Sequence, residues 1–244
     1  MENPVKKFLS ISEAAQYLSV SEATLRRWDK SGAFKATFHS PGAHRYYSQS
    51  DLEKKTKGIF RLTFDWASSD VPYIPESDFY CSTSDRFKAR HEVLTHAFEK
   101  VVALQATGSL ISSAAGEVGN NSYDHNLGNW PDIMGAFFAY DLGKRRIVLA
   151  DRGVGILATL RHVRPELSNH EEALRVAFTE FVTGRAPEHR GNGLKYVLNA
   201  ISQAKANFIF QSGDAILEVK KEKKDFVIKK ADNYIRGCLF LLEF

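Results

Sequence analysis

Four polar side chains in the middle of the chain have types and spacing suited to chemistry. Counted from the first, they lie at offsets of four, seven and eight residues, which puts them on one side of one helix: Glu117, Asn121, Asp124 and His125. A solvated face is the ordinary explanation, but Gly119 costs a helix interior about 1 kcal/mol and each Asn about half as much. We therefore expect a function that needs these groups, such as an Asn beside a metal and a Glu beside a water.

An acid followed by two close glycines marks a second candidate site. A predicted strand over residues 145–150 runs directly into Asp151, and Gly153, Gly155 and Ile156 follow. Glycines let the backbone come close to a bound molecule, and a carboxylate accepts a hydrogen bond from an exocyclic amine. The segment also fits the dinucleotide fingerprint G-x-G-x-x-A. However, two residues separate the strand from Gly153, and the helix predicted next leaves no place for a second, acid-bearing parallel strand, so we disfavour a Rossmann site.

A third glycine turn precedes a predicted helix over residues 194–206. Gly191 and Gly193 lie two positions apart, and Leu194 and Lys195 follow them. The N-terminus of a helix has unpaired N–H groups and the positive end of the helix dipole, both of which suit a phosphate. The sequence contains no G-x-x-x-x-G-K-[ST] motif, which excludes a P-loop. This turn therefore indicates phosphate binding of another type.

All of the excess positive charge lies at the start of the chain. Residues 1–57 hold ten Lys and Arg against six Asp and Glu, whereas the rest of the chain has equal numbers of each and the whole carries +4. This asymmetry predicts a short basic module with a polyanionic partner, joined to a larger domain with a different role.

Two short helices joined by a tight turn are predicted within this module. Apolar residues recur along residues 14–20, and Ser21 with Glu22 begins a second helix that stops at Gly32. In a helix-turn-helix the second helix lies in the major groove of DNA. Its polar residues would then be close to the duplex: Thr24, Arg26, Arg27 and Lys30.

Residues 8–55 resemble the winged helix-turn-helix of MerR and excisionase-type proteins. The resemblance is carried by LRRW, a following glycine, and a P-G-x-H-R-Y wing. It implies DNA contacts by Arg26 and Arg27, and contacts from the wing by His44, Arg45 and Tyr46, of which the last two would hold phosphates. It also implies a dimer, although the sequence shows no long dimerising helix after the wing. A small helical protein-interaction module is the alternative.

The three polar and glycine-containing segments resemble, in their order, the N, G1 and G2 boxes of the GHKL superfamily of gyrase, MutL, histidine kinases and anti-sigma kinases. They are E-x-x-x-N-S-x-D-H, D-x-G-x-G-I and G-x-G-L, and the resemblance covers most of residues 80–244. It implies Mg-ATP as the ligand, with Glu117 as general base, Asn121 on Mg²⁺ and Asp151 on the adenine amine.

The same resemblance assigns the remaining residues of the expected site. Gly153 and Gly155 would line the adenine pocket, Gly191 and Gly193 would meet the phosphates, and residues 157–190 would form a mobile lid over ATP. Other nucleotide contacts would come from neighbouring positions: Asp124, His125, Ile156, Leu194 and Lys195. One departure weakens the case for adenine, because Gly237-Cys238 stands where many relatives carry a Thr that helps to hold the base.

Together these patterns predict an α+β protein of two domains. A winged helix-turn-helix would occupy residues 1–57, a linker residues 58–71, and a GHKL domain residues 72–244. The second domain would be an α/β sandwich whose mixed sheet is covered by helices on one face. The linker assignment rests on a loss of helical periodicity after residue 57 and on the prolines that follow.

The predicted function is that of an ATP-dependent DNA-binding regulator, with double-stranded DNA as partner and ATP with Mg²⁺ as cofactors. The alternative is a protein serine/threonine kinase or an ATP-dependent binder of a STAS-like partner, as in anti-sigma factors. Slow ATP hydrolysis by Glu117 is compatible with the first. A cytoplasmic location is expected, because no stretch of about twenty apolar residues and no secretory signal is present.

Overall fold

Capping residues set the ends of two short helices at the start of the chain. The computed structural model describes residues 8–18, 20–181, 193–222 and 225–244, with α1 at Ile11–Leu18 and α2 at Glu22–Ser31. The Ser21 hydroxyl accepts a hydrogen bond from the backbone N–H of Thr24 at 3.1 Å, which caps the start of α2. Gly32 ends α2 in the left-handed conformation, with φ at 80°. The two predicted helices are therefore present.

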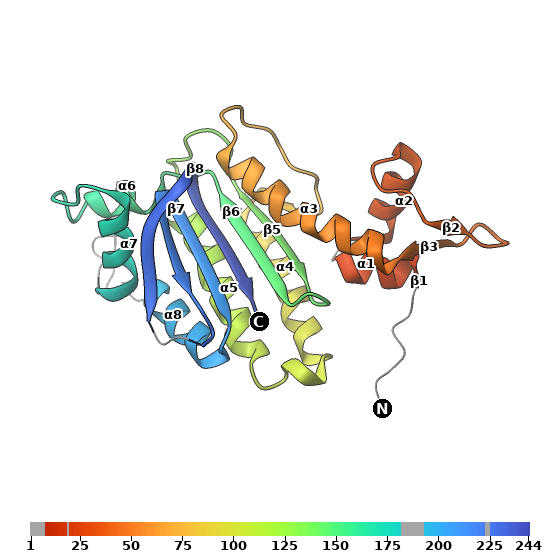
Figure 1. The fold of residues 1–244 in the computed structure, drawn as a ribbon. Helices are drawn as coiled ribbons and strands as arrows, with labels where there is room; N and C mark the ends of the chain where they lie inside the picture. The colour runs from red at the N-terminus through yellow and green to blue at the C-terminus, as the bar shows by residue number, and fades with distance from the viewer. Residues whose placement is uncertain (1–7, 19, 182–192, 223–224) are drawn as a thin grey trace.

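A small antiparallel sheet packs beside these helices. It contains β1 (Phe8–Ser10), β2 (Phe38–His39) and β3 (Arg45–Ser48), in the order β1-β3-β2. The strand β3 is the wing strand that was predicted, and the turn that precedes it extends away from the rest of the molecule (Figure 1). We refer to residues 8–48 as the N-terminal module.

One long helix connects the N-terminal module to the rest of the protein. The helix α3 spans Gln49–Ser68, so it runs through most of the stretch that was predicted to be a linker. The reason is that its apolar side has helical spacing after all: Phe60, Thr63, Phe64 and Ala67 lie on one side and are buried or half-buried. The loss of periodicity predicted from residue 57 onward was therefore wrong as far as Ser68.

The larger sheet is antiparallel throughout the described residues. It contains β4 (Tyr80–Cys81), β5 (Ala136–Asp141), β6 (Arg146–Asp151), β7 (Asn207–Val219) and β8 (Phe226–Glu243), in the order β4-β5-β6-β8-β7. Each of its pairings is antiparallel, so the prediction of a mixed sheet was wrong. The last two strands, β7 and β8, are long and pair as a hairpin.

Helices cover both faces of this sheet, whereas they were predicted on one face only. On one face lie α4 (Ser84–Glu99), α5 (Gly108–Asp124) and α8 (Gly193–Ala204), with the short 3₁₀ helix η1 (Val102–Leu104) between the first two. The C-terminal half of α3 covers the other face, where Trp66 is fully buried among residues of β5, β6 and β8 (Figure 1). No helix in the described ranges is long and apolar enough to cross a membrane.

The helix predicted over residues 156–182 is broken in two. α6 spans Gly155–Arg161 and α7 spans His170–Thr179, and Asn169 caps the second by accepting a hydrogen bond from the N–H of Glu172 at 2.8 Å. Both helices lie at the end of the sheet that is remote from the N-terminal module (Figure 1).

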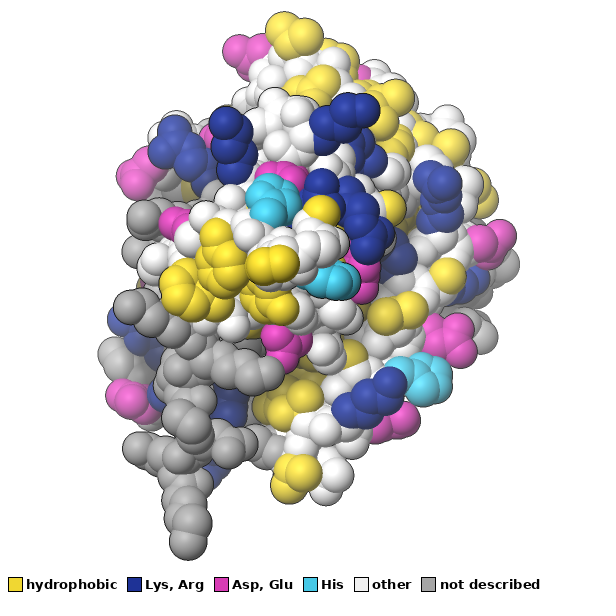
Figure 2. All heavy atoms as spheres, turned by 90° about the vertical axis from the view of Figure 1, so that its right-hand side faces the viewer, with side chains coloured by type: hydrophobic (Ala, Val, Ile, Leu, Met, Phe, Trp, Pro, Cys, Tyr) yellow, Lys and Arg dark blue, Asp and Glu magenta, His cyan; other side chains and the backbone are white. Residues whose placement is uncertain are grey.

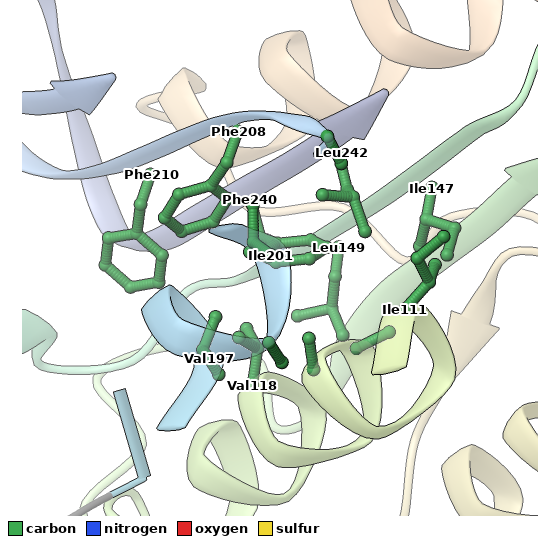
Figure 3. Packing of buried hydrophobic residues seen from close by; sticks show 14 of the residues in the cluster. Ile111, Val118, Ile147, Leu149, Val197, Ile201, Phe208, Phe210, Phe240 and Leu242 are labelled. Atoms are coloured by element: carbon green, nitrogen blue, oxygen red, sulfur yellow. The ribbon is translucent and has the colours of Figure 1, made fainter. Parts of the chain in front are cut away.

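The main core lies between the larger sheet and the helices α5 and α8. Figure 3 shows aliphatic side chains of both helices facing aromatic and aliphatic side chains of β6, β7 and β8. Burying each large side chain stabilises the fold by about 1.5–3 kcal/mol. Residues of this layer include Val118, Val197, Ile201, Leu149, Phe208 and Phe240.

Gly119 of α5 is explained by packing rather than by a ligand. A β-carbon at this position would lie 1.9 Å from Cζ of Phe87 on α4. The glycine therefore lets α4 and α5 approach each other closely, and Phe87 is buried in their interface. The low helix propensity of Gly119 is a cost of this contact and does not indicate chemistry.

We predict that Gly119→Ala lowers the free energy of unfolding by roughly 1–3 kcal/mol, because overpacking forces Phe87 to move. Gly58→Ala in α3 is the matched control, since a β-carbon there would have no neighbour within 4 Å. It should leave stability unchanged or raise it by up to about 1 kcal/mol through helix propensity. Chemical denaturation of both variants measures the difference, and equal stabilities would contradict the packing explanation.

Candidate nucleotide site and DNA interface

A cavity lies between the C-terminal half of α5, the starts of α6 and α8, and the strands β6, β7 and β8. It holds about 820 Å³ of empty space, a volume that includes solvent at its open side. The structure brings most of the predicted ligand residues to its walls: Glu117, Asn121, His125, Asp151, Gly155, Ile156, Gly193 and Leu194. Residues as far apart in the sequence as Glu117 and Cys238 therefore meet here.

Asp151 lies at the inner end of the cavity and is held by several donors. Its Oδ2 accepts a hydrogen bond from the Ser122 hydroxyl at 2.8 Å, and its Oδ1 accepts one from the N–H of Gly153 at 2.9 Å. Burial raises the pKa of Asp151 to about 6. These hydrogen bonds, with one from the N–H of Cys238, act in the opposite direction. Asp151 is therefore a buried acceptor that is ionised at neutral pH.

Glu117 and Asn121 lie together against the first residue of α8. A β-carbon at Gly193 would be 2.2 Å from Oε1 of Glu117 and 3.1 Å from Nδ2 of Asn121. Only glycine can therefore occupy this position without moving the Glu117 carboxylate. The result places a carboxylate and an amide beside the N-terminus of α8.

His125 lies on the wall of the same cavity, one residue beyond the end of α5. Burial lowers the pKa of His125 below its ordinary value. The imidazole is therefore neutral at pH 7, with one ring nitrogen available as a donor and the other as an acceptor.

Three predicted ligand residues do not line the cavity. Gly153 is covered by Asn126, whose side chain would lie 2.1 Å from a β-carbon at that position. Asp124 is the last residue of α5 and is exposed. The ammonium of Lys195 lies 3.4 Å from the ring centroid of Phe181, on a separate groove. Gly191, with residues 182–190 of the predicted lid, lies outside the described residues.

Several residues of the cavity were not found from the sequence. Ser122 directly follows Asn121 and Asn126 directly follows His125, so the polar run around the end of α5 could have indicated them. Phe210 and Cys238 come from β7 and β8. Next to a bulge in β7, the Ser212 hydroxyl donates a hydrogen bond to the Gly237 carbonyl at 3.0 Å. No local pattern marks such cross-strand neighbours.

Arg152, next to Asp151, faces the opposite side of the sheet. Its side chain is fully buried and pairs with Asp132, with 2.7 Å between Nη2 and Oδ2. It also donates a hydrogen bond to the carbonyl of Trp66 near the end of α3. Burial would raise the pKa of Asp132, but the hydrogen bond and charge of Arg152 hold it below its usual value. Asp151, which lines the cavity, and Arg152, which holds the end of α3, are thus adjacent in the sequence.

The exposed side of α2 is basic. Arg26, Arg27 and Lys30 are exposed on it, and Arg26 pairs with Glu22 of the same helix at 2.6 Å. Figure 2 views the molecule from the side of the N-terminal module and shows Lys and Arg side chains gathered above a hydrophobic cluster. The sequence predicted these three residues near DNA, and the structure leaves them accessible.

Thr24 is placed differently from the prediction. It is only 2% exposed, and its hydroxyl donates a hydrogen bond to the carboxylate of Asp78. Thr24 and Trp28 lie one helical turn apart, on the side of α2 that packs against the rest of the protein. Thr24 therefore does not lie on the accessible DNA side of the helix.

The wing residues are partly engaged within the N-terminal module. Nε of Arg45 lies 2.7 Å from Asp29, so this side chain would reach a phosphate only with its remaining N–H groups. The Tyr46 ring stacks on Phe38 at 5.0 Å between centroids. His44 is exposed at the turn of the wing. The pKa of Asp29 is lowered, first by a hydrogen bond from the N–H of Ala36 and then by Arg45.

Comparison with known proteins bears on this first part of the chain. Residues 8–54 match the family described as "Helix-turn-helix domain". The N-terminal module belongs to a helix-turn-helix domain. The match includes α1, α2 and the wing, and such a domain indicates DNA as a partner.

A relative in Escherichia coli shares a short stretch with this chain. "Type II methyltransferase M.Eco47II" is 33% identical over 64 residues, which is 26% of this chain. The same stretch covers only 15% of the length of that relative. The similarity is therefore that of a small segment.

The buried Asp151 predicts a specific pH dependence of stability. Its native pKa of about 6 lies above the unfolded value of about 3.9, so unfolding releases a proton between these values. The stabilisation by protonated Asp151 is complete below about pH 4 and is lost as the pH rises through 6, a change of roughly 3 kcal/mol.

Urea denaturation of wild type and Asp151→Asn at several pH values measures this effect. The difference in unfolding free energy between them should fall from pH 4 to pH 7 by roughly this amount. Asp232→Asn, at an exposed position of β8, is the control for the loss of a surface carboxylate. A difference between wild type and Asp151→Asn that does not change with pH would show that Asp151 is not a buried titrating group.

Proposed function

We propose that this protein is an ATP-dependent DNA-binding regulator. Its helix-turn-helix domain would bind double-stranded DNA, and the cavity would bind Mg-ATP in the manner of the GHKL superfamily. Nucleotide occupancy would act as the switch between states of different DNA affinity. The support is the geometry of the cavity and its direct link to α3.

The walls of the cavity suit the parts of a nucleotide. The Asp151 carboxylate is a buried acceptor for the exocyclic amine of a base, and Gly155, with φ at 78°, allows close approach beside it. Gly193 begins the 12-residue helix α8, whose N–H groups suit a phosphate chain. Between them, Ile156 and Leu194 supply apolar surface.

The residues at the phosphate end also suit Mg²⁺. The Asn121 side chain could supply one oxygen ligand, which fits an ion that keeps most of its ligands as water and phosphate. The ion would neutralise charge on the phosphates. Glu117 lies one helical turn from Asn121 and next to Gly193. There its carboxylate could accept a proton near the same phosphates.

The observation that carries the switch is the position of Arg152. The residue before it lies in the cavity, while its own side chain holds the Trp66 carbonyl of α3 and the Asp132 carboxylate. Helix α3 begins directly after the wing strand β3. A shift of the Asp151–Gly155 turn on ligand binding would therefore move the support of the helix that carries the DNA-binding module.

We predict that Asp151→Asn weakens ATP binding roughly 10- to 100-fold, because it removes a charged hydrogen-bond acceptor from the base. Isothermal titration with ATP, with and without Mg²⁺, measures this. Asp232→Asn, the same substitution on the exposed part of β8, should bind like wild type. Equal affinities of Asp151→Asn and wild type would remove the cavity as the nucleotide site.

We further predict that Mg-ATP changes the affinity of the wild type for DNA by at least about fivefold, as expected of an allosteric switch. Arg152→Lys should reduce this change while it retains ATP binding, since a lysine cannot hold Asp132 and the Trp66 carbonyl together. Arg236→Lys is the control, because Arg236 is a half-exposed neighbour of the same Asp132.

Fluorescence anisotropy of labelled duplex DNA measures both quantities. If wild type binds DNA equally with and without Mg-ATP, the switch is absent. If Arg152→Lys responds to Mg-ATP as fully as Arg236→Lys does, the switch does not operate through Arg152.

A further inference from the structure

An acidic segment lies against the recognition helix α2. Residues 69–79, which we call the strap, follow α3 and lead into β4. Oε2 of Glu76 accepts hydrogen bonds from Nε1 of Trp28 at 2.7 Å and from Nη2 of Arg27 at 3.1 Å. Asp78 accepts one from the Thr24 hydroxyl. Two carboxylates of the strap thus lie along one side of the helix that should approach DNA.

The strap is held from the side of the larger sheet. Its Tyr73 carbonyl accepts a hydrogen bond from Nε1 of Trp66 at 2.8 Å. At its other end, Phe79 stacks on Phe137 of β5 with 5.3 Å between ring centroids. The strap therefore belongs to the part of the protein that holds the larger sheet, and its contact with α2 joins that part to the DNA-binding domain.

The ion pair between Glu76 and Arg27 is accessible to solvent. The two side chains are 47% and 54% exposed, respectively, so a DNA phosphate can reach the same guanidinium. The Glu76 carboxylate competes with a DNA phosphate for this guanidinium, and a carboxylate beside the duplex also repels the phosphates of the DNA. Glu76 thus opposes DNA binding at a position where the neighbouring residues of α2 favour it.

We propose that the strap is an autoinhibitory element that competes with DNA for α2. Glu76 neutralises Arg27, and Asp78 holds Thr24 on the inner side of the helix. Full DNA affinity requires that Arg27 exchanges the Glu76 carboxylate for a DNA phosphate. This inference rests on the DNA binding of the proposed function, but it requires no nucleotide.

The test is DNA binding by Glu76→Gln without ATP. The glutamine oxygen can still accept the hydrogen bond from Trp28, so the packing of α2 is retained while the charge is removed. Anisotropy with a labelled mixed-sequence duplex at low ionic strength should show about two- to fivefold tighter binding, the range expected for release of a surface ion pair. The salt dependence should steepen, because Arg27 gains a phosphate contact.

Two controls separate this effect from a general change in charge. Glu218→Gln removes the same charge from an ion pair with Lys229 on the hairpin of β7 and β8. It should tighten DNA binding less than Glu76→Gln does, because only the net charge of the protein changes. In an Arg27→Ala background, Glu76→Gln should tighten DNA binding no more than Glu218→Gln does in the wild type. Near-ultraviolet circular dichroism should match the wild type in every variant that is compared.

Unchanged or weaker DNA binding by a folded Glu76→Gln variant would overturn the proposal, as would an equal gain in Glu218→Gln. If Glu76→Gln alters the near-ultraviolet dichroism, Asp78→Asn serves as the second variant. It removes the other carboxylate of the strap, while asparagine still accepts the Thr24 hydrogen bond. A strap effect without any response to Mg-ATP would leave this inference standing and refute the nucleotide switch. A response to Mg-ATP without a strap effect would refute this inference and leave the nucleotide switch standing.

Discussion

The fold depends on one buried guanidinium. Arg152 cannot lose its charge in a protein, so its burial requires a partner for the charge and acceptors for its N–H groups. Asp132 and the Trp66 carbonyl supply these, and they bring together the loop before β5, the end of β6 and the end of α3. Loss of one member of such a buried pair typically costs about 3–5 kcal/mol. This interaction fixes where α3 ends, and hence where the strap begins.

The elements that depend on local signals could be predicted from the sequence. The caps at Ser21 and Gly32 set the limits of α2, and the strand that leads into Asp151 lies where it was predicted. The residues of the cavity at helical spacing, Glu117 and Asn121, were found for the same reason, and the structure places both beside Gly193. Their assignment as base and magnesium ligand remains a prediction.

The features that depend on distant partners could not be predicted in this way. Trp66 is buried because β5, β6 and β8 cover it, and nothing near it in the sequence indicates these strands. The prolines after residue 70 suggested a linker, whereas the helix before them continues to Ser68 through its contact with the sheet. Gly119 and Gly153 suggested ligand contacts, but both make room for a neighbouring side chain, Phe87 and Asn126 respectively.

The place of β8 in the sheet has a consequence for the order in which the protein folds. This strand, which ends at Glu243, lies between β6 and β7, so the sheet remains divided until it has been synthesised. The cavity likewise lacks Cys238 until then. The helix-turn-helix domain contains mainly local contacts and can form much earlier. A ribosome-bound chain would therefore carry its helix-turn-helix domain well before its cavity is complete.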